Sequence, residues 1–419
     1  MLVYVINRHG KPIMPCKPGK ARKLLKQGKA TVEKHMPFTI RLTYGSSGYK
    51  QPITFGIDVG YKTAGVSATT EKQELYAAVA HLRTDISKLM AERSKLRHLR
   101  RSRTTRYRQR RTNRNPGKGW LPPSVKHKII SHLRLVREAN GILPIAKVIA
   151  ECAAFDTQKL EDPYIEGTEY QQGSMYGYNN RISFLLARES GKCQYCGKAG
   201  AEKGNGWRLH HIWGREFDRP EDWALVHKQC HDMLHDLKEE HVMQERCENS
   251  KPKSYREAAF MSVMRWAFYN KLKELYPDVS MTYGHVTYTD RKDTGIEKSH
   301  ANDAFCITKN LQAKQNETIY TQKFVRRNNR SLHKLTVRKG GYRQRATQDR
   351  VLRGFRMYDR VLFDGEEYFI FGRREKGSFL LESLDGSRRT ERAPSKLTLV
   401  EMAKNTLLTE KGERAFTTA

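Results

Sequence analysis

The sequence predicts a mixed α/β protein assembled from two to four compact units. Its 419 residues exceed the usual length of one domain. Residues 52–82 read as three successive strands, and residues 124–151 as an amphipathic helix leading into a buried strand, a pattern that favours an α/β core. The last hundred residues are basic and strand-like, with Asp364-Gly365 and Asp385-Gly386 as hairpin turns, and they indicate a small β-rich unit.

The first fifty residues form a pattern of their own, which ends in a Gly/Ser-rich hinge at residues 45–48. The expected elements are a strand at 2–6, a turn at 9–12, a basic helix at 20–28 stopped by Gly28, and a strand at 38–44. This order predicts a small N-terminal unit.

The rest of the chain alternates between strand and helix patterns around a Cys/His-rich insert at about 190–240. Residues 164–180 lack apolar periodicity and are expected to be a linker into the insert. After the insert we expect a helix at 258–276, a strand at 279–284 and a helix at 299–311. The insert therefore interrupts the α/β core in sequence.

A run of arginines without carboxylates follows the three-strand pattern, and these arginines cover every face of a projected helix. The run consists of Arg97, Arg100, Arg101, Arg103, Arg106, Arg108, Arg110, Arg111 and Arg114. The whole chain has 78 Lys+Arg against 45 Asp+Glu, a formal charge of +33. A phosphate backbone is the partner that best relieves this repulsion. A membrane surface would need an apolar face beside the charge, and a solvated helix would show charges of alternating sign.

Other classes of protein are disfavoured by the composition. No stretch reaches the roughly 18 apolar residues of a membrane span, and the first residues lack a signal-peptide pattern. The seven cysteines are an odd number, and three of them fall between 193 and 230, which suits a metal site in a reducing compartment. We expect a soluble, intracellular protein.

Three carboxylates and a histidine form the first candidate site. Asp58 and Glu151 each end an apolar strand, and Asp303 lies one helical turn after His300. Brought together, they would hold two Mg²⁺ ions roughly 3.5–4 Å apart for phosphodiester hydrolysis. Taken singly, each residue is weak evidence, because an Asp at a strand end is more often a turn former and Glu151 alone would be an ordinary polar surface residue.

The insert carries two pairs of residues at metal-ligand spacing, "CQYC" and "HKQC". The four predicted zinc ligands are Cys193, Cys196, His227 and Cys230. Four such ligands leave no open position, so the pattern indicates a structural zinc in a segment too small to fold on its own core.

Four further histidines in the insert suggest hydrolysis by a single metal ion. His210 and His211 are adjacent in a strand and point to opposite faces, whereas His231 and His235 share one face of a helix. In this hypothesis His211 deprotonates water, while His210 with His235 or His231 holds Mg²⁺. The alternative is a zinc-stabilised binding finger with polar surface histidines.

These motifs occur in an order that resembles the IscB family, transposon-encoded relatives of the CRISPR effector nucleases with RuvC and HNH domains. "KPIMP" is similar to the family's N-terminal Pro-Leu-Met-Pro signature, with Ile13 in place of Leu. "GIDVG", "IAECAAFDTQK" and "HANDA" resemble the three RuvC segments, and the arginine run resembles the bridge helix. "FIFGRR" and "LDGS" resemble the C-terminal module that reads a short motif beside the target.

The resemblance implies an RNase H-like RuvC core, split by an Arg-rich bridge helix and a ββα-metal HNH insert, with a small N-terminal α/β unit and a β-rich C-terminal module. The implied boundaries are 1–51 for the N-terminal PLMP-type domain, 52–87 for RuvC segment I, 88–117 for the bridge helix, 118–172 for RuvC segment II, 173–189 for a linker, 190–242 for HNH, 243–316 for RuvC segment III and 317–419 for the target-adjacent-motif domain.

By motif, Asp58, Glu151, His300 and Asp303 become the RuvC site with two Mg²⁺ ions, and His211 becomes the HNH base beside one Mg²⁺ ion. Two positions depart from the family pattern. The first HNH position is commonly Asp and here is His210, whose metal binding would weaken below about pH 6.5. The central Asn is here Asp222, which ligates a cation but lacks the amide donor.

The implied function is RNA-guided DNA cleavage, in which HNH cuts the guide-paired strand and RuvC the displaced strand. The implied partners are a long noncoding guide RNA (omega RNA), held by the arginine run, and a double-stranded DNA target with a short adjacent motif. We expect a monomeric ribonucleoprotein in a prokaryotic cytoplasm, associated with the nucleoid. Two alternatives stay open: a nicking or nuclease-dead RNA-guided binder, and a guide-independent RuvC-type junction resolvase.

Overall fold

The computed structural model describes residues 2–102, 120–152, 174–201, 203–215, 218–237, 240–246, 256–326, 335–337, 343–345, 351–374 and 377–414. The chain divides into two compact units. The first unit joins residues 1–154 to residues 260–419, and the second consists of residues 155–259. The fold is mixed α/β with several sheets, as the sequence predicts.

The N-terminal unit is a four-stranded sheet in the order β2-β1-β4-β3, with one helix. Its elements are β1 (Val3–Ile6), β2 (Pro12–Cys16), α1 (Pro18–Lys26), β3 (Ala30–Lys34) and β4 (Thr39–Leu42). Helix α1 ends as predicted, because Gly28 adopts a φ of +67° that favours glycine. Strand β3 was not predicted, since most of its residues are exposed and it lacks an apolar alternation.

The largest sheet has seven strands in the order β11-β8-β5-β6-β7-β12-β20. Their bounds are β5 (Thr54–Asp58), β6 (Thr63–Thr69), β7 (Glu74–His81), β8 (Lys147–Glu151), β11 (Val279–Thr282), β12 (Thr318–Phe324) and β20 (Leu407–Glu413). The three strands expected in residues 52–82 are confirmed as β5, β6 and β7. Strands β5 and β8 run parallel, so their carboxyl ends lie side by side.

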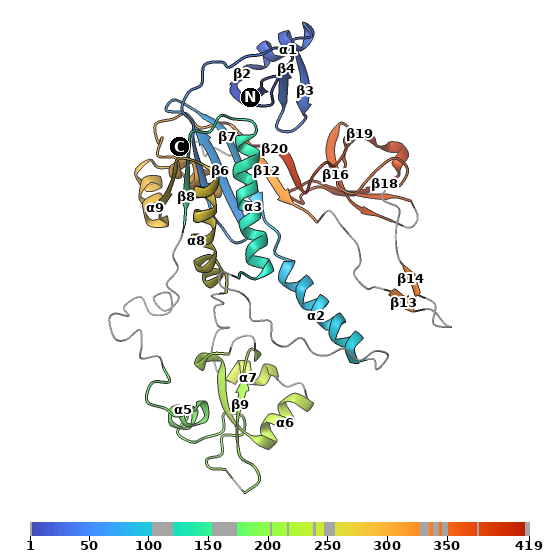
Figure 1. The fold of residues 1–419 in the computed structure, drawn as a ribbon. Coiled ribbons are helices and arrows are strands. Elements are labelled where there is room, and N and C mark those ends of the chain that lie inside the picture. Colours follow the sequence, from blue (N-terminus) through green and yellow to red (C-terminus); the bar gives the residue numbers. More distant parts are fainter. Residues whose placement is uncertain are drawn as a thin grey trace. The chain divides into compact units, whose positions relative to one another are not determined.

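Helices cover both faces of this sheet. On one face, α3 (Pro123–Asn140) and α8 (Arg256–Leu275) pack against Phe55, Ile57 and Val66 in the main hydrophobic core (Figure 1). On the other face, α10 (His300–Ile307) contacts β5 and β6. These two strands carry Gly56 and Gly65 under α10, and a Cβ on Gly65 would lie 1.8 Å from the His300 carbonyl oxygen. The two glycines therefore allow α10 to approach the sheet closely.

Residues 285–293, without a predicted element, belong to α9 (Gly284–Asp293), which lies between β11 and α10 in the chain and begins at the last residue of the predicted strand. Helix α2 (Ile86–Ser102) begins the arginine-rich segment, and of the arginine run only Arg97 has a described, exposed side chain. Residues 103–114 lie outside the described residues, as do the side chains of Arg100 and Arg101. Among the helices that the structure describes, none is both long and apolar enough to cross a membrane.

The C-terminal segment contains a five-stranded antiparallel sheet in the order β18-β17-β16-β15-β19. Its strands are β15 (Arg360–Phe363), β16 (Glu366–Arg373), β17 (Phe379–Glu382), β18 (Arg389–Arg392) and β19 (Thr398–Glu401). Both predicted hairpin turns are found, since Asp364-Gly365 joins β15 to β16 and Asp385-Gly386 lies between β17 and β18. The short strands β13 (Leu335–Val337) and β14 (Arg343–Arg345) form a separate hairpin.

The expected C-terminal boundary differs from the structure in one respect. Strands β12 and β20, at the two ends of residues 317–419, belong to the seven-stranded sheet and pair with each other. Strand β12 buries alternate residues and β20 buries its first three residues, 407–409. Tyr320 of β12 packs in the main core with Tyr4 and Tyr76. The five-stranded module therefore leaves the core sheet after β12 and returns to it through β20.

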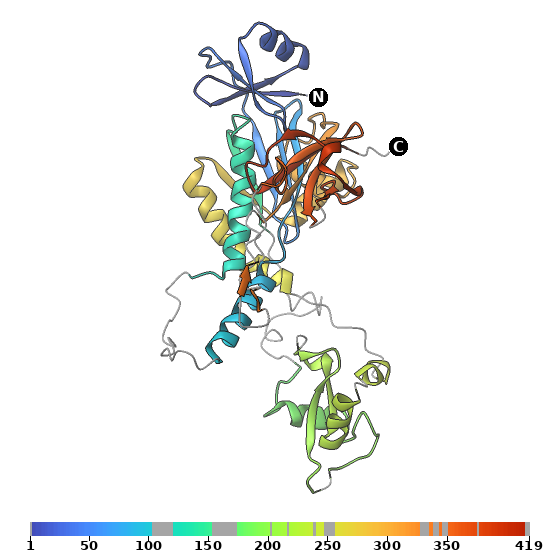
Figure 2. The same cartoon turned by 90° about the vertical axis from the view of Figure 1, so that its right-hand side faces the viewer.

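The second unit contains a two-stranded antiparallel sheet between short helices (Figure 2). Its elements are α5 (Arg181–Arg188), β9 (Trp207–His211), the 3-10 turn η3 (Pro220–Asp222), β10 (Trp223–His227), α6 (Lys228–Asp236) and α7 (Glu240–Arg246). Helix α5 lies in a segment expected to be a linker. It forms because Asn180 and Ser183 make a capping box, while Phe184 and Leu185 pack on Trp223 of the strand face.

Candidate functional sites

We name three clusters by their residues. The carboxylate site consists of Asp58, Glu151, His300 and Asp303; the cysteine site of Cys193, Cys196, His227 and Cys230; and the histidine site of His210, His231 and His235. The first lies in the unit with the seven-stranded sheet, and the other two lie in the unit of residues 155–259. Each is described within its own unit.

In the carboxylate site, parallel pairing of β5 and β8 places Asp58 directly opposite Glu151 at the carboxyl ends of both strands. Helix α10 brings His300 over this edge, and His300 Nδ1 lies 2.7 Å from Asp58 Oδ2. Asp303 follows one turn later on the same helix. The fold thus gathers the four predicted residues at one end of the sheet.

Electrostatics at this edge favour a cation. Burial is the main cause that raises the pKa of Glu151 to about 7, and the charges of Asp58 and Asp303 act in the same direction. Burial and Asp58 also raise the pKa of Asp303, while the hydrogen bond to Asp58 raises the pKa of His300. A divalent cation would relieve the repulsion among the three carboxylates.

Two side chains that the sequence did not single out complete this site. Arg291 of α9 places Nε 3.2 Å from Asp303 Oδ1, and the Thr287 hydroxyl donates a 2.6 Å hydrogen bond to Glu151 Oε2. Both come from α9, which was not predicted, so the sequence carried no signal that places them at this edge.

The carboxylate donors match Mg²⁺ in chemistry, because it prefers oxygen ligands. Within the described residues, only the cysteine and histidine sites have ligand atoms that all lie within 4.8 Å of one another. The ligand atoms of the carboxylate site are not grouped as closely as those of the other two sites. In this site Asp58 is paired with His300, and Asp303 with Arg291.

The cysteine site brings its four predicted ligands together, three from sulfur and one from imidazole. Cys196 Sγ lies 3.5 Å from His227 Nδ1, and His227 Nε2 lies 2.6 Å from the Gly200 carbonyl oxygen. Because a carbonyl only accepts, Nε2 carries the hydrogen and Nδ1 is left to bind a metal. A tetrahedral set of this kind fits zinc.

The surroundings of the cysteine site indicate a structural role. Cys193 and Cys230 belong to a small core with Ala224, Val226 and Leu234. Burial, with the neighbouring sulfurs of Cys196 and Cys193, raises the pKa of the Cys230 thiol, and a bound zinc would take the place of that proton. The metal would therefore link α6 to the loop at Cys193 where the apolar core is small.

The histidine site is built from His210, the penultimate residue of β9, and from His231 and His235 of α6. His210 is buried and both of its ring nitrogens lack a hydrogen-bond partner among the described residues. Its ring lies 5.6 Å from that of His231 and 5.3 Å from that of His235, measured between centroids. Burial, with the neighbouring histidines, lowers the pKa of His210 to about 4. A neutral, unpartnered imidazole facing two others is a metal-ligand arrangement.

The donors of the histidine site are three imidazole nitrogens with no carboxylate among them. Imidazole suits Zn²⁺, Ni²⁺, Cu²⁺ or Fe²⁺, whereas Mg²⁺ prefers oxygen ligands. The set therefore fits a divalent transition metal better than the Mg²⁺ expected from the sequence. The binding of Mg²⁺ by His210 with His235 or His231 stays a prediction.

His211 points to the other face of the strands. It lies opposite Trp223 in the β9–β10 ladder, and Trp223 faces α5, whereas His210 lies opposite Ala224 on the α6 face. His211 Nε2 lies 3.1 Å from Asp218 Oδ1. Sequence reasoning missed Asp218, because its relation to His211 arises from the loop that follows β9.

Asp222 does not join the histidine site. Its Oδ1 accepts a 2.6 Å hydrogen bond from the Trp213 backbone N–H, and its buried Oδ2 has no partner among the described residues. Burial raises the pKa of this carboxyl. Asp222 therefore holds the loop after β9 in shape, and we assign it no contact with a metal.

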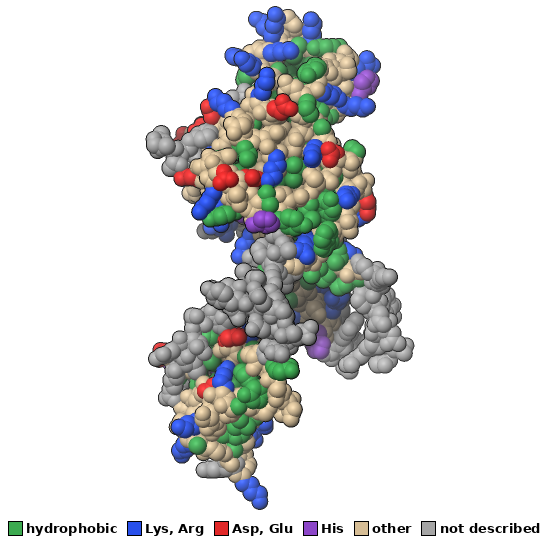
Figure 3. Space-filling model, turned by 90° about the vertical axis from the view of Figure 1, so that its left-hand side faces the viewer, with side chains coloured by type: hydrophobic (Ala, Val, Ile, Leu, Met, Phe, Trp, Pro, Cys, Tyr) green, Lys and Arg blue, Asp and Glu red, His purple; other side chains and the backbone are tan. Residues whose placement is uncertain are grey.

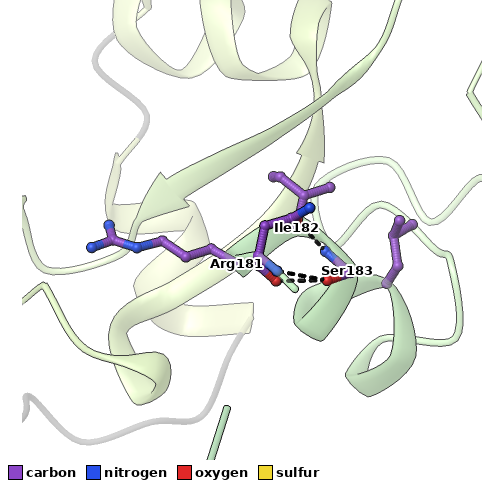
Figure 4. A pocket seen from close by; sticks show the side chains of 5 residues that line it. Arg181, Ile182 and Ser183 are labelled. Atoms are coloured by element: carbon purple, nitrogen blue, oxygen red, sulfur yellow. Dashed lines mark hydrogen bonds between the residues drawn. The ribbon is translucent and has the colours of Figure 1, made fainter. Parts of the chain in front are cut away.

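A surface hollow lies on α5 and is lined by Asn180, Arg181, Ile182, Ser183 and Leu186 (Figure 4). Capping hydrogen bonds join Asn180 and Ser183, two of its lining residues, at the start of the helix. Arg181 extends away from Ile182 and Ser183 (Figure 4). No residue that lines this hollow belongs to the three clusters.

Two family models match the chain. One, described as RRXRR protein, matches residues 3–173, and the other, described as HNH endonuclease, matches residues 193–237. The second range contains the whole cysteine site and the whole histidine site. Residues 193–237 are therefore an HNH endonuclease domain. No curated protein matches the chain.

Among solved structures, the chain is similar to Streptococcus thermophilus Cas9 in complex with the AGGA PAM, with 15% identity over 46% of this chain and 26% of that chain and a TM-score of 0.33. The complex of the same Cas9 with the GGAA PAM is 15% identical over 50% of this chain and 29% of that chain, with a TM-score of 0.34. The type II-C Cas9 from Actinomyces naeslundii is 14% identical over 45% of this chain and 32% of that chain, with a TM-score of 0.17. The chain thus spans less than a third of each of these proteins.

Proposed function

We propose that the chain is an IscB-like protein and a metal-dependent, RNA-guided DNA endonuclease, because a match to the RRXRR family model is followed by an HNH endonuclease domain. The observation that carries the proposal is that each compact unit holds residues that could bind a divalent ion near exposed surface: the carboxylate site in the first unit and the histidine site in the second. Two such centres suit the cleavage of two DNA strands.

In the proposed RuvC site, Asp58, Glu151 and Asp303 hold the divalent ions that activate water and stabilise the leaving oxygen of a phosphodiester. His300 lies 2.7 Å from Asp58 and is half exposed, so it is placed to move a proton at the edge of the site. Arg291 compensates the charge of Asp303 beside it. This site would cut the displaced strand.

In the proposed HNH site, His210, His231 and His235 hold one divalent ion that polarises the scissile phosphate. His211, the last residue of β9, acts as the general base from the end of this strand, because no partner is found for its Nδ1 among the described residues. The cysteine site maintains the local fold. This site would cut the guide-paired strand.

The charge of the chain supports a nucleic-acid partner. On α1, Lys20, Arg22, Lys23 and Lys26 are all exposed. Figure 3 shows Lys and Arg side chains gathered on the N-terminal unit. Together with the net charge of +33 and the arginine run, this surface suits the phosphates of a noncoding guide RNA, which would supply sequence recognition through base pairing. We propose that the five-stranded C-terminal module contacts the short motif beside the target.

The proposal is tested by sequencing the RNA that copurifies with the full chain and by cleavage assays programmed with that RNA. A defined transcript and cleavage of a plasmid that matches its guide segment are expected, whereas a plasmid with a scrambled match should stay intact. Cleavage of branched DNA without RNA would favour the junction resolvase. Defined RNA and target binding without cleavage in any divalent metal would favour a nuclease-dead binder.

A further inference from the structure

Asp218 is an exposed aspartate to which neither the family patterns nor the proposed chemistry assigns a role. Its carboxylate accepts hydrogen bonds from three side chains of the same unit: Arg181, His211 and Trp223. These partners come from α5, β9 and β10. The carboxylate therefore lies where three elements of the HNH domain converge.

The position of Asp218 is held from two directions. Arg181 binds it with both guanidinium nitrogens, with Nη1 2.8 Å from Oδ1 and Nη2 3.1 Å from Oδ2. Trp223 Nε1 donates to Oδ1 at 3.0 Å, and the Arg181 guanidinium lies over the Trp223 ring, 4.7 Å from its centroid. A bidentate pair with stacking fixes the orientation of a carboxylate as well as its place.

We infer that Asp218 is a positioning residue for the HNH general base, which it holds in the Nε2–H tautomer. The inference rests on the proposed function, because it concerns how His211 works. An ionised carboxylate only accepts, so the 3.1 Å contact requires the hydrogen on His211 Nε2. The lone pair is then on Nδ1, which becomes the atom that takes the proton from water.

The register of the strands supports this assignment. His211 and Trp223 are paired residues of β9 and β10 and share the face that packs against α5. Arg181, in the first turn of α5, therefore reaches the same face, and Asp218 connects it to His211. His210 on the opposite face remains for the metal. The two adjacent histidines thus receive separate roles and separate partners.

The test compares Asp218→Asn with the parent in the full chain loaded with guide RNA. An asparagine can turn its amide toward Nε2 and donate, which favours the Nδ1–H tautomer that cannot act as the base. The single-turnover rate on the guide-paired strand should fall about 10- to 100-fold, while DNA affinity and cleavage of the displaced strand stay at parent values. Asp218→Glu keeps a carboxylate and should recover part of the rate.

A spectroscopic readout separates positioning from a structural effect. In long-range ¹H–¹⁵N spectra of ¹⁵N-histidine-labelled protein, with the signal assigned through His211→Gln, the parent should show His211 as the Nε2–H tautomer and Asp218→Asn should lose that preference. Glu189→Gln is the matched control, because Glu189 follows α5, pairs with Arg188, and makes no hydrogen bond or ion pair with His211. This control should change neither rate nor spectrum.

Three results would overturn the inference: a parent protein with His211 as the Nδ1–H tautomer, an Asp218→Asn variant that cuts at the parent rate, or one that cuts slowly with an unchanged tautomer. Arg181→Gln, which removes the clamp but keeps the carboxylate, should give an intermediate rate, and this variant still tests the inference if Asp218→Asn does not fold. Absence of paired-strand cleavage in the parent would contradict the proposed function, whereas the tautomer measurement would still test the role of Asp218.

Discussion

His300 Nδ1 lies 2.7 Å from Asp58 Oδ2, although the two residues come from the third and first of the RuvC-like segments. The contact depends on α10 lying close on β5 and β6, which Gly56 and Gly65 permit. The geometry of the carboxylate site therefore rests on positions that carry no side chain.

Gly65→Ala tests this dependence. The new Cβ would lie 1.8 Å from the His300 carbonyl oxygen, so the backbone of α10 must move away from the sheet. We expect a loss of about 1–3 kcal/mol in the free energy of unfolding and a slower cut of the displaced strand. Gly45→Ala is the control, because nothing lies within 4 Å of its added Cβ. Denaturant titration and strand-specific cleavage check both expectations. A Gly65→Ala variant with the parent's free energy of unfolding and the parent's cleavage rate would contradict the packing argument.

The raised pKa of Glu151 predicts a pH dependence of metal binding. Without metal, burial keeps this carboxyl protonated up to a pH of about 7, against an ordinary value of 4.5. Stability contributed by the protonated form is lost as pH rises toward 7, and above 7 a bound cation offsets the cost of the buried charge. Mg²⁺ should therefore raise Tm more at pH 8 than at pH 6.

Glu151→Gln provides the control for this measurement, because an amide does not titrate in this range. The difference between the Mg²⁺-induced shifts in Tm at pH 8 and pH 6 should shrink in the variant. Equal shifts at both pH values in the parent would show that Glu151 binds no metal.

The cysteine site predicts one structural zinc. Cys193→Ser should lose this zinc, unfold the HNH domain and end cleavage of the guide-paired strand, because the domain has only a small apolar core. The displaced strand should still be cut, since the carboxylate site lies in the other compact unit. Elemental analysis of purified parent and variant checks the metal. A parent protein without zinc would refute the assignment.

The sequence predicts the elements whose burial is uniform. Strands β5 and β8 are apolar runs that each end in a carboxylate, so Asp58 and Glu151 could be assigned before their contact was known. The spacing of Cys193 and Cys196 likewise indicates a metal site directly. Each of these signals lies within a few consecutive residues, so it can be recognised without knowledge of the tertiary contacts.

Other features depend on tertiary contacts and could not be predicted. Strand β3 is mostly exposed and shows no alternation, and helix α5 depends on packing against Trp223. Arg291 and Asp218 are ordinary charged residues in the sequence, and they gain their significance from the partners that the fold brings to them. The fit of the histidine site to a transition metal depends on the meeting of three imidazoles, which the fold brings about.

The central claim is that two independent sites each cut one strand of an RNA-matched DNA target. Its most direct test is a cleavage assay with separate end labels on the two strands, using guide-loaded parent, Asp58→Ala and His211→Ala. We expect the parent to cut both strands, Asp58→Ala to cut only the guide-paired strand, and His211→Ala to cut only the displaced strand, with the lost cut slowed on the order of 10²- to 10⁴-fold for the general base. If either variant still cuts both strands at the parent rate, or if both lose the same strand, the assignment of two separate active sites is wrong.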